Sequence, residues 1–241
     1  MSELKPKKLK FGIVCSTAGG TIFAAVEIFN SVYPDSIEIV VATDRECGIE
    51  PICQERGIQY QRFSDPDKNN LSSTIAAFFK KQDNITAVLL YFVRLISRDL
   101  YGQFPTLNIH PSLLPAFPGF NAVERALESD VKFLGATLHL VDETVDCGPF
   151  IAQNVHPLQD ISIEEAYRLS FAQKVYLTLL LFEMMAFEKI EFGIKNTEEF
   201  LHYFTESMAC GKTENPSLTG ADLKMAFKRF LEKECLSIYK A

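Results

Sequence analysis

The sequence predicts an α/β protein, in which a mostly parallel sheet is covered by helices on both faces. Short β-branched, apolar runs alternate with longer segments of helical periodicity, and this alternation is typical of parallel strands joined by crossover helices. Small or polar residues separate the segments, as expected of turns. The chain has 241 residues, 47% of them hydrophobic, which is enough for one α/β domain with a sizeable core and an appendage.

The first unit of this pattern lies near the start of the chain. Residues 9–15 predict a buried strand, residues 16–20 a small-residue loop, and residues 21–32 a helix. Further elements are expected as strands at 37–42 and 85–92, a helix at 71–81 and a candidate short strand at 58–61. Because ligands of parallel sheets bind at the carboxyl ends of the strands, the first loop is expected to open on a site.

Two polar side chains share one face of a strand expected at residues 106–110. Asn108 and His110 are two positions apart, so their side chains leave the same side of the sheet while Ile109 points to the other. Pro111 directs the chain out of the sheet, because proline has no N–H to donate to a strand ladder. The pair is therefore expected at the rim of a site.

An acidic residue, Asp146, completes a set of groups suited to acyl transfer. Attack of an amine on an acyl carbon creates a negatively charged oxygen, which Asn108 and a protonated His110 can stabilise as hydrogen-bond donors. Asp146 can favour the charged imidazole and take the proton of the amine, directly or through a water. Each residue also has a structural interpretation as a local hydrogen-bonding or turn residue. His139 stands two positions beyond Thr137 on the next expected strand, and packing explains it as well as a role in the site does.

Two loops flank these residues. In the loop at 16–21, Gly19 and Gly20 let the backbone approach an anion at a helix amino terminus, although a small-residue turn needs no ligand. The loop at 115–119 has two prolines and a glycine, and it is expected to form a fixed wall of the site.

The rest of the chain predicts helices. Ser162 and Glu165 form a capping box, so a long helix is expected to begin near residue 162. Residues 196–208 and 219–239 have amphipathic periodicity and are joined by a polar linker at 209–217. This helical C-terminal tail is expected either to pack on the domain or to build a homodimer interface.

The net charge and the cysteine and histidine positions indicate which partners, compartment and metals to expect. The net charge of −7 argues against nucleic-acid binding, and the basic cluster at 5–10 is expected to be a solvated leader. No secretory signal or membrane-length apolar run is visible, so a cytoplasmic protein without membrane contact is expected. No metal is expected, because the cysteines and histidines lack ligand spacing. They are Cys15, Cys47, Cys53, Cys147, Cys210 and Cys235, and His110, His139, His156 and His202.

The residues of the expected site resemble a known family. Residues 108–115 read Asn-Ile-His-Pro-Ser-Leu-Leu-Pro, residues 135–139 read Gly-Ala-Thr-Leu-His, and Asp146 stands shortly before Gly-Pro at 148–149. In this order and spacing they resemble the folate-dependent formyltransferases. The resemblance implies a Rossmann-like sheet and transfer of a formyl group from 10-formyltetrahydrofolate to an amine, that of glycinamide ribonucleotide in de novo purine synthesis.

The resemblance also implies domain limits and a role for each site residue. A basic leader (1–8) would precede a formyltransferase domain (9–190) and a helical C-terminal extension (191–241). The catalytic group would be Asn108, His110 and Asp146. The phosphorylated amine would be bound by Gly19, Gly20, Thr21 and Pro111. The folate would contact mainly the backbone of Arg94, Leu95, Ile96, Val141, Asp142 and Val145.

Two departures from the family pattern affect the acceptor side. The family loop usually reads Ser-Gly-x-Gly-Ser-Asn, whereas here its last two residues are Gly20 and Thr21. On the long helix the family usually has Gln-Glu-His, and the glutamate reaches the substrate. The present chain has Gln173, Lys174 and Val175 there, which places a cation where an anion is expected. The acceptor amine is therefore left open.

Three alternative functions remain open. The first is transfer to another amine, such as an amino sugar nucleotide. The second is hydrolysis of formyltetrahydrofolate, although that group usually has His-His-Ser where this chain has His110-Pro111-Ser112. The third is a folate-binding protein without activity, against which the intact Asn108, His110 and Asp146 count.

Overall fold

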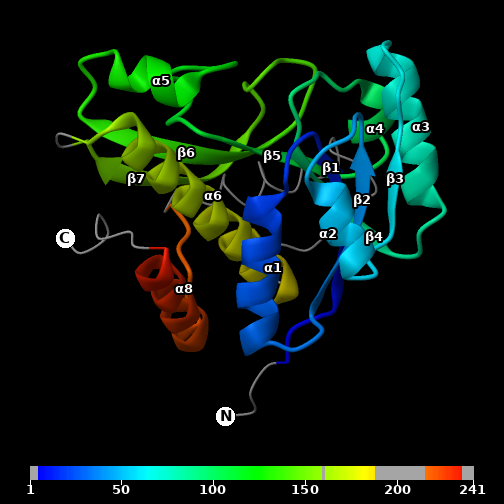
Figure 1. The fold of residues 1–241 in the computed structure, drawn as a ribbon, viewed down its shortest axis with the longest axis horizontal. Helices are drawn as coiled ribbons and strands as arrows, with labels where there is room; N and C mark the ends of the chain where they lie inside the picture. The colour runs from blue at the N-terminus through cyan, green and yellow to red at the C-terminus, as the bar shows by residue number, and fades with distance from the viewer. Residues whose placement is uncertain (1–4, 159–160, 188–214, 235–241) are drawn as a thin grey trace, which may run out of the picture.

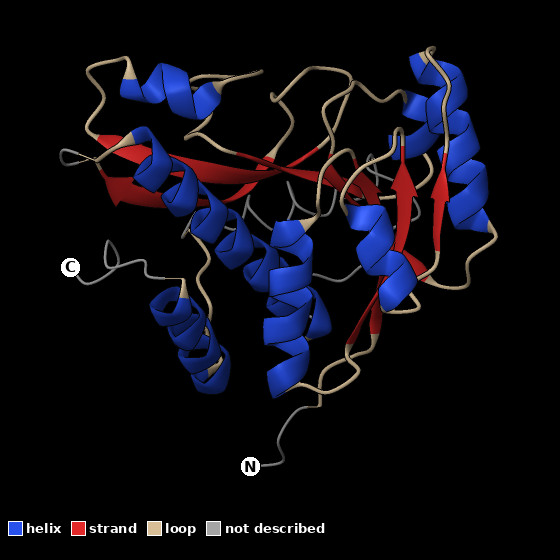
Figure 2. Ribbon diagram, in the orientation of Figure 1, coloured by secondary structure: helices blue, strands red, loops and turns tan. Residues whose placement is uncertain are grey.

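A seven-stranded sheet organises the molecule (Figures 1 and 2). The computed structural model describes residues 5–158, 161–187 and 215–234. The strand order is β3-β2-β1-β4-β5-β6-β7. The strands are β1 (Leu9–Cys15), β2 (Ile37–Thr43), β3 (Tyr60–Arg62), β4 (Ile85–Tyr91), β5 (Thr106–His110), β6 (Phe133–Leu140) and β7 (Phe150–Pro157). The first five are parallel, and β6 runs antiparallel to both β5 and β7. The predicted α/β class with a mostly parallel sheet is confirmed.

Strand boundaries follow the apolar runs. β1 and β5 have the predicted limits, and β2 and β4 differ from theirs by one residue at the carboxyl end. The candidate short strand is present but displaced, because its pairing with β2 begins at Tyr60 and extends to Arg62. Burial on both faces explains the continuous apolar character of β1, whose residues after Lys10 are all buried.

Helices cover both faces of the parallel strands. α1 (Gly20–Val32), α2 (Ile49–Glu55) and α6 (Ile163–Ala186) pack on one face, and α3 (Lys68–Lys80) and α4 (Arg98–Tyr101) pack on the other. Figure 1 shows α1 and α6 side by side, with α8 (Ala221–Lys233) next to them. α5 (Ala122–Leu127) lies against the start of α6. These layers leave the carboxyl ends of the strands uncovered.

The long helix α6 begins as predicted. Ser162 is its N-cap, and the capping box with Glu165 is formed in both directions. Contrary to the expectation from sequence, α6 is an apolar run long enough to cross a membrane, but 83% of its most apolar window is buried inside the protein. It is therefore placed as the central core helix, which explains its apolar character on all sides.

The part of the tail that the structure describes packs on the domain. Near the end of α6, the buried Glu183 accepts hydrogen bonds from the backbone N–H groups of Thr219 (2.8 Å) and Gly220 (2.6 Å), at the start of α8. Leu223, Phe227 and Leu231 of α8 join the core beside α1 and α6. α8 lies within the predicted 219–239, whereas the predicted helix at 196–208 lies outside the described residues.

Four elements were not predicted. α2, α4 and α5 span seven, four and six residues, too short for a helical period to be recognised. β7 contains Gln153, Asn154 and His156 and has no clear alternation. It is recruited because β6 offers it an antiparallel partner.

Candidate active site

A cleft of about 430 Å³ opens at the carboxyl ends of β1, β4 and β5. Every residue of the three sets named above lines this cleft, whereas of the loop at 115–119 only Gly119 does. From the catalytic set these are Asn108, His110 and Asp146; from the acceptor set Gly19, Gly20, Thr21 and Pro111; from the folate set Arg94, Leu95, Ile96, Val141, Asp142 and Val145. The structure thus brings the three sets together, and the role of each residue stays a prediction.

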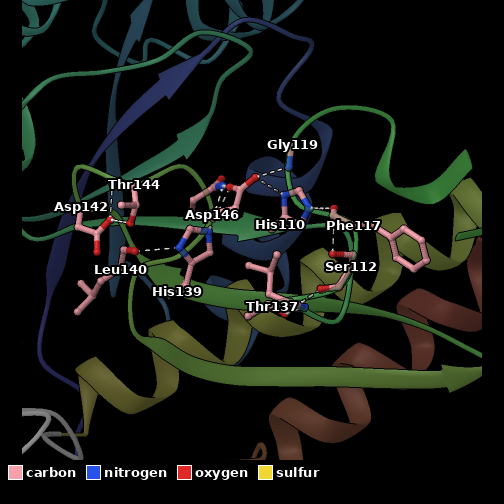
Figure 3. A network of polar contacts seen from close by, with 12 residues as sticks. His110, Ser112, Phe117, Gly119, Thr137, His139, Leu140, Asp142, Thr144 and Asp146 are labelled. Atoms are coloured by element: carbon pink, nitrogen blue, oxygen red, sulfur yellow. Dashed lines mark hydrogen bonds and ion pairs between the residues drawn. The ribbon is translucent and has the colours of Figure 1, made fainter. Parts of the chain in front are cut away.

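Asp146 lies at the centre of a polar network (Figure 3). Its Oδ2 is 3.2 Å from Nδ1 of His110 and accepts a 2.8 Å hydrogen bond from the backbone N–H of Gly119. Its Oδ1 accepts a weaker, 3.5 Å bond from Nδ2 of Asn108 and lies 3.7 Å from Nε2 of His139. The carboxylate therefore faces hydrogen-bond donors on both oxygens while remaining at the cleft surface.

The two histidines differ in what their rings can do. Nε2 of His110 is 2.8 Å from the carbonyl oxygen of Phe117, which only accepts, while Nδ1 faces Asp146. A doubly protonated ring satisfies both contacts. His139 instead donates from Nδ1 to the Leu140 carbonyl (2.8 Å), and burial lowers the pKa of its ring, which favours the neutral form.

Neutral His139 orients Asn108. With a hydrogen on Nδ1, its Nε2 is an acceptor, and it lies 3.3 Å from Nδ2 of Asn108. One amide hydrogen is therefore used by His139, and the other points at the distant Oδ1 of Asp146. Because that second contact is long, the hydrogen is available to a stronger acceptor in the cleft. This contact suits a positioning role for His139, whose role the sequence leaves open.

The loop at 115–119 contributes its backbone to this network. The Phe117 carbonyl and the Gly119 N–H contact His110 and Asp146 directly. The loop is itself held by Ser112, whose hydroxyl donates to the Ala116 carbonyl at 2.5 Å. The prediction that this loop forms a wall of the site agrees with these contacts, because the loop supplies one acceptor and one donor to the catalytic group.

The turn after β6 presents Asp146 in an unusual conformation. Asp146 has φ 53°, in the left-handed region, which aspartate tolerates better than most residues. Two positions later, a Cβ on Gly148 would lie 2.0 Å from the Leu140 carbonyl oxygen, so only glycine fits. The turn is thus pressed against the end of β6, and this close packing directs the carboxylate toward β5.

At the end of the cleft near the start of α1, the polar groups come from the backbone rather than from side chains. Gly19 is the N-cap of α1 with φ 70°, and no side chain caps the helix, so the amides of its first turn are free for a ligand. A Cβ on Gly19 would meet the buried Ile49 at 2.6 Å. Lys174 lines the cleft from α6, and burial lowers the pKa of its amine.

Apolar side chains line the region between β4 and the turn before Asp146. Val93, Leu95 and Val145 are about half exposed at the cleft, whereas Ile96 and Val141 pack on the core beneath. The Arg94 guanidinium donates to the Asp65 and Pro66 carbonyls at 2.7 and 2.9 Å, so its charge is turned toward that loop. This apolar surface fits a flat ring held by backbone contacts.

The sequence did not single out every residue of the cleft. Phe120 is 74% exposed and lines it, and Thr17, Lys68 and Glu143 line it as well. Phe120 directly follows the Pro-Gly pair of the wall loop, and nothing in the pattern marks it as different from a core aromatic residue. Among the described residues, no group of three or more His, Cys, Asp or Glu side chains is arranged to hold a metal ion.

Comparisons with known proteins agree with this geometry. Residues 33–175 match the family model described as formyl transferase. Over 158 residues the chain is 34% identical to a phosphoribosylglycinamide formyltransferase of Mycobacterium tuberculosis, which covers 64% of this chain and 73% of that protein.

Two further matches extend the comparison. A formyltetrahydrofolate deformylase of Synechocystis sp. is 35% identical over 121 residues, 49% of this chain and 43% of that protein. The crystal structure of a phosphoribosylglycinamide formyltransferase from Brucella melitensis superposes with a TM-score of 0.65 at 31% identity, covering 75% of this chain and 97% of that one.

Proposed function

Since the chain belongs to the formyl transferase family, we propose that it transfers the formyl group of 10-formyltetrahydrofolate to the amine of glycinamide ribonucleotide. The observation that carries the proposal is the contact of Asn108, His110 and Asp146 at one end of the cleft. The similarity to phosphoribosylglycinamide formyltransferases of Mycobacterium tuberculosis and Brucella melitensis supports the choice of acceptor.

The catalytic group is suited to the charge that develops during transfer. 10-Formyltetrahydrofolate supplies an activated formyl carbon, and its oxygen becomes negative as the amine attacks. Asn108 donates its loosely held amide hydrogen to that oxygen. The positive ring of His110 lies beside it, held between Asp146 and the Phe117 carbonyl. Both groups therefore stabilise negative charge that is absent from the ground state.

Asp146 is the proposed base. An attacking amine must lose a proton, and Asp146 is the carboxylate that contacts both other catalytic side chains. It accepts that proton directly or through a water. The proton then leaves with the folate nitrogen as tetrahydrofolate is released.

The two substrates are assigned to opposite sides of this group. The folate ring is placed on the apolar surface of Leu95 and Val145, with backbone contacts from 93–96 and 141–145. The acceptor phosphate is placed at the uncapped amino terminus of α1, next to Gly19 and Gly20. Both lie within reach of Asp146 because one cleft joins them.

Domain limits and setting complete the proposal. We assign the catalytic domain to residues 9–190, preceded by a leader (1–8) and followed by the helical extension (191–241). The role would be in purine synthesis in the cytoplasm, where a reducing environment agrees with free Cys15, Cys47, Cys53 and Cys147. Its partners would be small molecules, the folate and a phosphorylated amine.

Hydrolysis of formyltetrahydrofolate is the second candidate, because deformylases also match the chain. One assay separates the two. Release of tetrahydrofolate from 10-formyltetrahydrofolate is followed by absorbance without acceptor and then with glycinamide ribonucleotide. We expect turnover only with the acceptor. Equal turnover in its absence would establish the hydrolase, and binding of folate without turnover in either case would contradict both.

A further inference from the structure

A lysine that has no partner among the described residues lies in the part of the cleft assigned to the acceptor. Lys174 lines the cleft from α6, and its ammonium makes no ion pair or hydrogen bond with any residue that the structure describes; burial lowers the pKa of this amine. The carboxylates of the same cleft, Asp142, Glu143 and Asp146, therefore do not pair with it. A partly buried ammonium without a counter-charge is costly, so the fold keeps it for a reason other than stability.

The packing of α6 directs this lysine toward the start of α1. A Cβ on Gly20 would lie 3.5 Å from the ring of Phe171, so the first turn of α1 meets α6 at that residue. Lys174 is three residues further along and shares a helix face with Phe171. Because helical side chains tilt toward the amino terminus, the Lys174 stem runs back over the turn that carries Phe171.

The start of α1 carries a partial positive charge that, like the charge of Lys174, is not offset by an acidic residue. Gly19 caps the helix without a side chain, and the first turn contains no acidic residue that could complement the dipole. The loop also lacks polar side chains at 18–20, which read Ala-Gly-Gly. Two unneutralised positive features, one from backbone amides and one from an ammonium, thus border the same volume.

We propose that Lys174 is a phosphate-binding and specificity-determining residue, which holds the phosphate monoester of the acceptor together with the amino-terminal amides of α1. The inference rests on the proposed function in placing the acceptor at this end of the cleft. It goes beyond it by assigning the discrimination between phosphorylated and unphosphorylated amines to one side chain. An ammonium contributes a compact charge with three donors, and it replaces the hydrogen bonds that a polar loop would supply.

Direct binding tests the proposal without turnover. Ribose 5-phosphate and ribose are titrated calorimetrically into the wild type, Lys174→Met and Lys174→Arg at one fixed ionic strength. We expect ribose 5-phosphate to bind the wild type, Lys174→Met to weaken this binding roughly 10- to 100-fold, and Lys174→Arg to retain most of it. Ribose should bind equally poorly to all three proteins. Lys81→Met makes the same chemical change on an exposed residue at the end of α3 and should have no effect.

Kinetics with glycinamide ribonucleotide and its dephosphorylated riboside then identify the source of the effect. Lys174→Met should raise KM for the ribonucleotide and leave KM for the riboside unchanged, with kcat similar for both. Equal affinity of the wild type and Lys174→Met for ribose 5-phosphate, or no binding by the wild type, would overturn the proposal. Lys174→Gln is a second neutral variant in case the methionine variant does not fold.

The outcome is separate from that of the proposed function. A wild type that binds ribose 5-phosphate through Lys174 but does not formylate glycinamide ribonucleotide would keep this inference and overturn the acceptor. Formylation of the ribonucleotide with an unchanged KM in Lys174→Met would keep the acceptor and overturn the role of Lys174.

Discussion

The two ends of the cleft present different kinds of chemical group, side chains at one end and mainly backbone amides at the other. At the proposed catalytic end, the side chains of Asn108 and His110 each lie within 3.5 Å of the Asp146 carboxylate. At the proposed acceptor end, Gly19 and the uncapped turn of α1 offer backbone amides, and the ammonium of Lys174, which has no partner among the described residues, lines the same cleft.

The difference shows which sequence changes each end tolerates. A site made of side-chain functional groups depends on the identity of each residue, because no neighbour can replace a carboxylate or an amide. A site made of backbone groups depends on conformation, so Gly20 and Thr21 can differ from the family pattern as long as α1 begins in the same place. Substitutions at the first end should therefore lower kcat, and those at the second should raise KM.

Asp146→Asn should have the largest effect. The variant keeps the size of the side chain but removes the base, and kcat should fall by roughly 10²–10⁴, the usual contribution of general acid–base catalysis. Steady-state kinetics with glycinamide ribonucleotide measures it. Asp83→Asn, on an exposed residue just before β4, is the matched control. Normal turnover by Asp146→Asn would remove the carboxylate from the mechanism.

Asn108→Ala should lower kcat by roughly 10²–10³, because an oxyanion donor is lost. His139→Ala should lower it less, since His139 acts by orienting Asn108 through the 3.3 Å contact. In the double variant the loss should equal that of Asn108→Ala alone, because a positioning residue has nothing left to position. Additive losses in this double-mutant cycle would show that His139 acts independently of Asn108.

The fold was predictable from local patterns, but the pairing of distant segments was not. The apolar runs that became β1 and β5 and the capping box of α6 were readable because each is a local signal. α5 and β7 were not, since a short helix and an irregular strand acquire their structure from the packing of their neighbours. Local propensity alone does not contain that information.

The candidate site likewise has features that the sequence predicts and features that depend on tertiary structure. The common face of Asn108 and His110 follows from the two-residue period of a strand. That Asp146 lies 3.2 Å from His110 depends on the antiparallel pairing of β5 with β6 and on the left-handed turn that follows it, and only the resemblance to a family suggested it. The backbone contacts of Phe117 and Gly119 could not be predicted, because a loop conformation is set by what surrounds it.

Gly19→Ala should have an intermediate effect, confined to the acceptor end. Gly57→Ala is its matched control, because both glycines have positive φ, 70° and 65°, and only Gly19 would place a Cβ against a neighbour, 2.6 Å from Ile49. Both variants should lose about 1–2 kcal/mol of stability from left-handed strain, and Gly19→Ala should lose more because Ile49 must shift. Gly19→Ala should in addition raise KM for the acceptor about 10-fold, equivalent to about 1.4 kcal/mol. An equal KM in the two variants would mean that the loop does not bind the acceptor.

The smallest effect should come from Glu50→Gln, which changes stability near the acceptor end without touching the cleft. Glu50 of α2 is buried and accepts hydrogen bonds from Thr43 (2.6 Å) and from Nε of Arg62 (2.9 Å), and the Arg62 guanidinium lowers the pKa of its carboxyl. Because Arg62 is 40% exposed and screened by solvent, we expect a loss of about 1 kcal/mol in urea unfolding at neutral pH.

The pH dependence of that loss identifies its origin. A carboxyl whose pKa is lower in the folded state stabilises the protein fully above its unfolded value of about 4.3, and this contribution disappears as the pH falls through the folded pKa. The difference between the wild type and Glu50→Gln should therefore be constant above about pH 5 and shrink in more acidic solution. KM and kcat should not change, since Glu50 is absent from the cleft lining. A change in KM for the acceptor would show that α2 and the loop at 16–20 are coupled through the Ile49–Thr17 backbone hydrogen bond, and that the acceptor end depends on side chains outside the cleft after all.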